Sequence, residues 1–178
     1  WSLAAGDFDG DAYDDLAVGL PGGRSAGGSG GCVTGAVLVF DGSASGLVDP
    51  AGPAHYWDPG ADFGVVLHCV EHFGEALAAG DVDRDGHDDL VVGAPKTLWY
   101  TAEEIFTEAG AAHLIYGSGS GLTAAGYVTQ LGLAAYDHFG TAVAIGNVVR
   151  TSAPTNPREV VVSAPGTEVT TVDNAGSL

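Results

Sequence analysis

Apolar positions along the chain fall into short runs that end at glycine or proline. Residues 15–21 (DLAVGLP), 89–95 (DLVVGAP), 36–40 (AVLVF) and 112–116 (AHLIY) are rich in β-branched and other apolar side chains. Runs of this kind, bounded by Gly, Pro and Ser, predict β-strands. Only residues 101–110 (TAEEIFTEAG) have the spacing of a helix, and they lie in a connection between predicted strands. The pattern therefore predicts an all-β fold.

The chain contains internal repeats. Leu3–Gly22 aligns without gaps with Leu77–Lys96, at an offset of 74 residues. A weaker third copy, Val143–Gly166, needs a short insertion after Arg150. Repeats at a fixed spacing indicate one structural unit used several times.

Two further markers follow the same spacing. The block Gly35–Leu47 recurs as Gly110–Leu122. The pairs Phe73-Gly74 and Phe139-Gly140 each begin eight residues before the turn that follows the next predicted strand. Units of about 66–74 residues with several short strands each are typical of β-propeller blades.

These markers divide the chain into three repeats and one insertion. A further Phe-Gly pair, Phe63-Gly64, has no acidic turn at the right distance, and we treat it as a chance match or as part of the insertion. The predicted units are a first repeat at 1–62 that starts after its own Phe-Gly, an inserted loop at 63–72, a second repeat at 73–138, and a truncated third repeat at 139–178.

Two turns of the repeat carry a regular series of aspartates. The acids stand at positions 1, 3, 5 and 9, so alternate side chains can converge on one point, and the carbonyl at position 7 adds another oxygen. Gly86 at position 6 allows a sharp bend, whereas the first turn has Ala12 there and Gly10 at position 4, which predicts a somewhat different bend. The candidate ligands are Asp7, Asp9, Asp11, Tyr13 (carbonyl) and Asp15 in one turn, and Asp81, Asp83, Asp85, His87 (carbonyl) and Asp89 in the other.

Calcium is the cation that best fits these turns, because every expected ligand is oxygen and magnesium requires a stricter octahedron. We therefore expect two Ca²⁺ sites, against the alternative of solvated turns without metal. An EF-hand needs an acid at position 12 and a following helix, but Val18 and Val92 stand there inside strand-like runs. The third copy has Asn147 at position 1 and no acids at positions 3 and 5, so we expect no calcium there.

Composition narrows the classes of partner. The 178 residues include 23 acidic and 5 basic ones, for a net charge of −18, which disfavours nucleic acid and anionic lipid. No apolar run is long enough for a transmembrane helix, and membrane insertion is not expected. The start at Trp1 indicates a mature or excised piece. The cysteines, Cys32 and Cys69, are either a disulfide or two thiols.

Other side chains offer weaker signals. His68, Cys69, Glu71 and His72 could form a zinc or copper site, although an ordinary inserted loop is the simpler interpretation. A binding platform for sugar or peptide is conceivable from the aromatic residues, with core packing as the favoured alternative. These aromatic residues are Trp1, Trp57, Trp99, Tyr56 and Tyr100.

The sequence from Phe73-Gly74 to Gly93-Ala94-Pro95 resembles the FG-GAP repeat of integrin alpha-subunit headpieces and of many bacterial extracellular proteins. Gly19-Leu20-Pro21 and Ser163-Ala164-Pro165 are near matches. The resemblance implies blades of a propeller, commonly seven-bladed, whose aspartate turns bind calcium. The chain holds only about two and a half to three repeats, so we expect the remaining blades to come from the same chain, a partner or symmetry copies.

By this resemblance we expect a calcium-stabilised, non-catalytic segment of an extracellular or cell-surface protein that acts in adhesion or binds a protein or glycan ligand. Two alternatives stay open: an accessory or catalytic part of a secreted hydrolase, and a calcium-dependent lectin.

Overall fold

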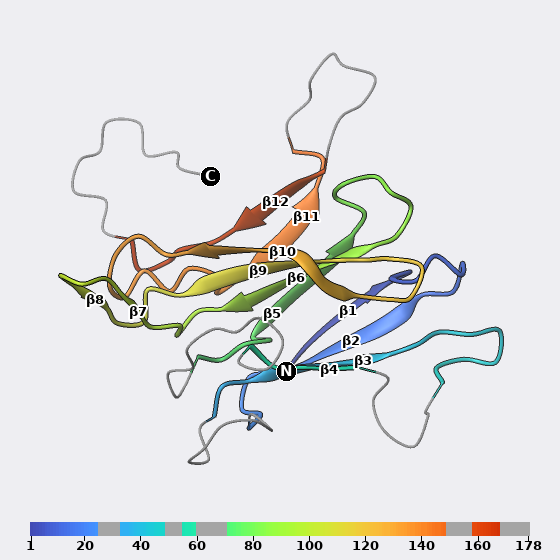
Figure 1. The fold of residues 1–178 in the computed structure, drawn as a ribbon, viewed down its shortest axis with the longest axis horizontal. Coiled ribbons are helices and arrows are strands. Elements are labelled where there is room, and N and C mark those ends of the chain that lie inside the picture. Colours follow the sequence, from blue (N-terminus) through green and yellow to red (C-terminus); the bar gives the residue numbers. More distant parts are fainter. Residues whose placement is uncertain (25–32, 49–54, 60–70, 149–157, 168–178) are drawn as a thin grey trace.

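The computed structural model describes residues 1–24, 33–48, 55–59, 71–148 and 158–167, and every element with described bounds is a β-strand (Figure 1). The strands form two four-stranded antiparallel sheets and two two-stranded ones. The first sheet, in spatial order, comprises β1 (Ser2–Gly6), β2 (Asp15–Leu20), β3 (Ala36–Phe40) and β4 (His55–Trp57). The second comprises β5 (Ala76–Gly80), β6 (Asp89–Ala94), β9 (Ala111–Tyr116) and β10 (Thr123–Leu131). The smaller sheets pair β11 (Val143–Gly146) with β12 (Glu159–Val162), and β7 (Trp99–Tyr100) with β8 (Ile105–Phe106).

The two large sheets have the same register, which explains the sequence repeat. Gly6 pairs with Asp15 at the end of β1, and Gly80 pairs with Asp89 at the corresponding place in β5. Strand β6 is buried along its whole length, and β2 alternates between buried and half-buried positions. Central strands carry apolar side chains on both faces because each face packs against a neighbouring sheet.

The three sheets that the repeats build lie next to one another through their first strands. Strand β1 packs against β5, and β5 packs against β11 (Figure 1). Side chains from both large sheets meet in one apolar core, whose largest fully buried members include Phe8, Phe73, Leu90 and Ile115. This arrangement confirms the predicted all-β fold and is consistent with propeller-type blades.

Within the described residues, the pairs Phe73-Gly74 and Phe139-Gly140 each make a junction between successive sheets. The N–H of Phe73 donates to the carbonyl of Thr34 (3.0 Å), and the N–H of Phe139 donates to that of Ala109 (2.9 Å). A Cβ at Gly35 would lie 2.2 Å from the Phe73 carbonyl oxygen, so only glycine permits this approach. The pair therefore docks on the preceding blade while its own blade begins.

Residues 101–110, which have helix-like spacing in the sequence, are not helical, in agreement with the all-β prediction. They form the turn and second strand of the β7–β8 hairpin, in which the rings of Trp99 and Phe106 stack at 3.8 Å. The Thr101 hydroxyl accepts the N–H groups of Glu103 and Glu104, and the Thr101 N–H donates to the Glu104 carbonyl. These local bonds favour a tight turn over a helix.

Several predicted features fall outside the described residues. They are Cys32, Cys69, His68, Phe63-Gly64 and most of the third turn. Within the described part of the chain, no helix has the length and apolar character needed to cross a bilayer.

Candidate metal centre

The two aspartate series form the loops that join the first and second strands of each large sheet. Loop 1, residues 7–14, connects β1 to β2, and loop 2, residues 81–88, connects β5 to β6. Because the two strand pairs have the same register, each loop starts directly after a strand glycine and ends at a buried aspartate, Asp15 or Asp89. The sequence repeat is therefore also a repeat of loop geometry.

In loop 1 the carboxylates fold back onto the loop's own N–H groups. Asp7 accepts bonds from the N–H of Asp11 (3.0 Å) and of Ala12 (2.9 Å). Asp9 accepts the N–H of Asp11 (3.1 Å), and Asp11 accepts the N–H of Tyr13 (2.9 Å). These bonds turn the side chains at positions 1, 3 and 5 toward the inside of the loop.

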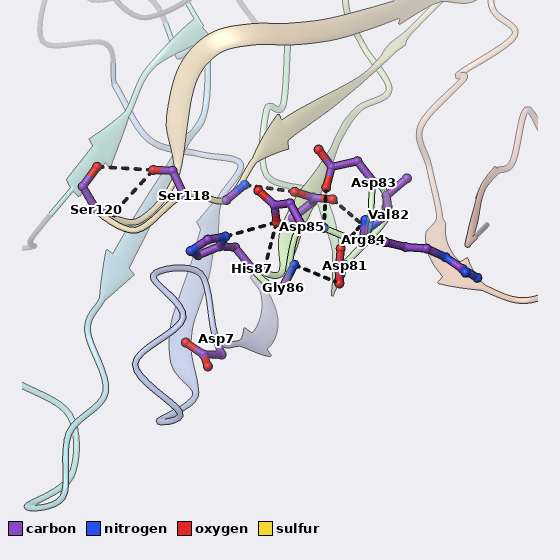
Figure 2. Close-up of polar contacts among 12 residues, drawn as sticks. Asp7, Asp81, Val82, Asp83, Arg84, Asp85, Gly86, His87, Ser118 and Ser120 are labelled. Carbon is purple, nitrogen blue, oxygen red and sulfur yellow. Dashed lines mark hydrogen bonds and ion pairs between the residues drawn. The ribbon is translucent and has the colours of Figure 1, made fainter. Parts of the chain in front are cut away.

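Loop 2 repeats this arrangement (Figure 2). Asp81 accepts the N–H of Arg84 (2.6 Å) and of Gly86 (3.3 Å), and Asp83 accepts that of Asp85 (3.2 Å). Asp85 accepts the N–H of His87 (2.9 Å), and the His87 Nδ1 lies 3.1 Å from the same carboxylate oxygen. The pKa of Asp85 is lowered, and the hydrogen bond from the His87 N–H is the largest cause.

The last aspartate of each loop is buried and holds the loop to the sheet. Asp15 accepts the N–H of Phe8 (3.0 Å) and of Gly42 (2.7 Å). Burial raises the pKa of Asp15, while these two N–H groups lower it and the charges of Asp9 and Asp41 raise it. Two charge-assisted bonds to one buried carboxylate fix the distance between the start of the loop and the turn after β3.

Asp89 has the same role in the second sheet. It accepts the N–H of Val82 (2.7 Å) and of Gly117 (2.9 Å). Burial again raises the pKa of this carboxyl, the bonds from Gly117 and Val82 lower it, and the charge of Asp83 raises it.

Each loop gathers three carboxylates closely enough to share a cation. One oxygen from each of Asp7, Asp9 and Asp11 lies within 4.8 Å of the other two, and the same holds for Asp81, Asp83 and Asp89. Asp15 is absent from the first group and Asp85 from the second, so the two sets are not identical. Grouped carboxylates of like charge repel one another, and an all-oxygen donor set suits a hard divalent cation. The residues therefore fit calcium in ligand type.

The position-7 residues face in different ways. Tyr13 is exposed, with 44% of its surface accessible, whereas the His87 ring is half-buried against Asp85 and the neighbouring loop. Their main-chain carbonyls stay predicted ligands.

The backbone bends in the same way in both loops, which corrects the expectation of different bends. Positions 4 and 6 both have positive φ: 75° and 74° at Gly10 and Ala12, and 68° and 94° at Arg84 and Gly86. Each loop places glycine at only one of the two positions, and an L-residue tolerates the left-handed conformation at the other. Inspection of the sequence missed this because it assigned the bend to the glycine alone.

The described members of two other candidate groups from the sequence differ in their surroundings. Trp57 is buried and Trp99 stacks on Phe106, whereas Trp1 and Tyr100 are exposed. In the histidine-rich segment, Glu71 is buried and His72 Nδ1 lies 2.6 Å from Glu75.

Comparison with known proteins gives a consistent family. A profile of the FG-GAP repeat matches residues 1–40 and 73–115, the segments that hold β1–β3 and β5–β9. Integrin alpha-PS2 of Drosophila melanogaster is 34% identical over 96 residues, covering 53% of this chain and 5% of that protein. Integrin alpha-5 of Xenopus laevis is 26% identical over 145 residues, covering 81% of this chain and 12% of that protein. Integrin alpha pat-2 of Caenorhabditis elegans is 30% identical over 98 residues, covering 53% and 6%.

The chain thus spans about an eighth or less of the length of these relatives. Both aspartate loops and the Phe73-Gly74 junction lie in the matched segments. The profile match and the integrin alpha relatives support an FG-GAP repeat, integrin alpha-like family for this chain.

Proposed function

We propose that the chain is a calcium-stabilised segment of an extracellular β-propeller that binds a protein or glycan ligand in adhesion and catalyses no reaction. One observation carries the calcium part of this proposal. Two sheets of the same topology hold carboxylate loops of the same register, and each loop brings three carboxylates within 4.8 Å of one another.

Calcium would be held by the carboxylates at positions 1, 3, 5 and 9 and the carbonyl at position 7 of each loop. When bound, the ion supplies charge neutralisation and cross-links the loop. The chain's own contribution is to aim the carboxylates: N–H bonds within the loop orient Asp7, Asp9 and Asp11, and the buried Asp15 and Asp89 fix the loop ends. The ligand sets are Asp7, Asp9, Asp11, Tyr13 and Asp15, and Asp81, Asp83, Asp85, His87 and Asp89.

The adhesion part of the proposal rests on family membership. Integrin alpha subunits are named among the similar proteins, and an open run of blades leaves apolar surface at its ends. Trp1 and Leu3 at the first blade are 94% and 65% exposed, which a neighbouring blade would cover. The partners we propose are therefore further blades, from the same or another polypeptide, and a ligand held at the cell surface.

Thermal unfolding with and without calcium tests the metal sites. At a free calcium concentration of about 100 times Kd, each site adds about 2.7 kcal/mol to the free energy of unfolding. For a chain of this size that corresponds to a rise in Tm of roughly 5–10 °C per site. EGTA should remove this increment, and calcium but not an equal concentration of magnesium should restore it.

Variants Asp9→Ala and Asp83→Ala, which remove equivalent carboxylates from the two loops, should each abolish about half of the calcium-dependent rise. Native mass spectrometry should show two bound ions in the unmodified chain and one in each variant. A melting curve that is the same in EGTA and in calcium would refute calcium stabilisation. Surface labelling of cells that express the full-length tagged protein tests the proposed location.

A further inference from the structure

The two acidic loops contact each other across the boundary between the blades. The N–H of Asp88 donates to the main-chain carbonyl of Asp7 (2.8 Å), and the N–H of Asp7 donates to Asp88 Oδ2 (3.2 Å). Figure 2 shows Asp7 on the loop that lies beside loop 2. Asp88, at position 8, is not among the expected ligands of loop 2. It nevertheless bonds both the N–H and the carbonyl of Asp7, the first expected ligand of loop 1.

A second connection runs through the turn after β9. The buried Asp89 of loop 2 accepts the N–H of Gly117 (2.9 Å), and the next N–H along the chain, that of Ser118, donates to the carbonyl of Phe8 (3.1 Å). Phe8 directly follows Asp7, and its own N–H is held by Asp15. The start of loop 1, at Asp7 and Phe8, is therefore tied to residues whose positions depend on loop 2.

Side-chain packing closes the same boundary. A Cβ built on Gly10 would lie 2.9 Å from Cδ2 of His87, so the bend of loop 1 rests on the imidazole ring of loop 2. That ring is fixed by its contact with Asp85 (3.1 Å). A change in the order of loop 2 will therefore alter the packing at Gly10 as well as the hydrogen bonds at Asp7.

We infer that Asp88 is a positioning residue that couples the two loops, so that calcium bound at one loop raises the affinity of the other. The inference rests on the proposed calcium binding. Binding at loop 2 orders residues 81–89, fixes Asp88 and His87, and so removes part of the ordering cost that loop 1 would otherwise bear on binding. Coupling of binding free energies is reciprocal, so loop 1 must raise the affinity of loop 2 by the same factor.

The chain provides its own matched control. Asp14 occupies position 8 of loop 1, but it is exposed and takes no part in the bonds between the two loops described above. Asp14→Ala therefore removes the equivalent carboxylate without touching the boundary between the two loops. Asp88→Asn keeps an oxygen that can accept the Asp7 N–H, whereas Asp88→Ala removes it.

The test is a set of calcium titrations of the full chain against a competing chelator. The affinity of loop 1 is measured alone in Asp83→Ala, that of loop 2 alone in Asp9→Ala, and both together in the unmodified chain. We expect the affinity of each loop to be about fivefold to tenfold higher when the other is intact, and by the same factor in both directions. Asp88→Ala should remove most of this factor, while Asp88→Asn and Asp14→Ala should keep it. Circular dichroism checks that each variant retains its β-sheet content.

The outcomes separate this inference from the proposed function. If neither loop binds calcium, the proposed function fails. If both loops bind, but each with an affinity independent of the other, the coupling is refuted and the calcium sites stand. Coupling that survives in Asp88→Ala, or that Asp88→Asn loses as fully as Asp88→Ala does, would overturn the role given to the Asp88 acceptor oxygen.

Discussion

Protonation of the buried His113 should destabilise the fold in mild acid. The side chain lies on β9 and is only 3% exposed. Its Nδ1 is 2.9 Å from Thr129 Oγ1, and its ring packs edge to face with that of Phe73, with 5.3 Å between the ring centroids. Burial lowers the pKa of His113 from 6.5 to about 4. The folded state therefore keeps this imidazole neutral at a pH where the unfolded chain has already bound a proton.

The size and sign of the effect follow from the two pKa values. Because the unfolded state binds more protons below pH 6.5, stability is complete above that pH and is lost as the pH falls toward 4. Between pH 7.5 and pH 4.5 the loss from this one group is about 2–3 kcal/mol, and it approaches about 3–4 kcal/mol well below pH 4.

Urea unfolding at a series of pH values measures this loss. Other groups also titrate in this range, so the quantity to follow is the difference in unfolding free energy between the unmodified chain and His113→Gln, whose amide can still bond Thr129. The difference should shift in favour of the variant by about 2.5 kcal/mol as the pH falls from 7.5 to 4.5. A difference that stays constant to within about 0.5 kcal/mol over this range would refute a neutral, desolvated histidine.

The remaining predictions concern backbone geometry. Ala12→Gly and Arg84→Gly should each stabilise the chain by about 0.5–1 kcal/mol, because both residues have positive φ, and Gly10→Ala should destabilise it for the same reason. Chemical unfolding at saturating calcium measures these changes in the free energy of unfolding. Destabilisation by both substitutions to glycine would contradict the prediction. Gly93→Ala should cost about 3 kcal/mol or more, since its Cβ would lie 2.0 Å from the Gly140 carbonyl oxygen. Gly22→Ala, with no atom within 4 Å of the new Cβ, is its control in the same unfolding assay, and an equal effect of the two substitutions would argue against the close approach of the blades.

The first three strands of each large sheet along the chain could be predicted from the sequence, and the fourth could not. Strands β2, β3, β6 and β9 are apolar runs that lie inside their sheets and are largely buried or half-buried, and the repeat alignment marked them twice. Strand β10 lies at the sheet edge, has mostly half-buried and exposed residues, and is interrupted by an irregularity between Thr123 and Val128. Short strand β4 has one buried residue, Trp57, which a sequence pattern does not separate from a loop. Edge strands lack a continuous apolar signal because water covers part of their surface.

For the candidate site, spacing alone placed the aspartates on two loops, since register and loop length are local properties. Contacts between the loops depend on how the blades pack, and no local pattern encodes them. The position-8 aspartate belongs to neither predicted ligand set, yet Asp88 reaches the neighbouring loop. The bend of each loop likewise depends on positive φ at Ala12 or Arg84. Alanine and arginine rarely adopt this conformation, so the sequence does not predict it there.

The Phe-Gly junction has a consequence for how such proteins can be divided. The bridges Gly35 to Phe73 and Gly110 to Phe139 mean that the final backbone partner of each blade is encoded in the following repeat. A fragment cut directly before Phe73 would leave Thr34 and Gly35 of the first blade without their partner. Gene fragments meant to yield single folded blades should therefore extend beyond the next Phe-Gly pair. Exchange of a whole sequence repeat between such proteins also exchanges one of the backbone junctions between blades.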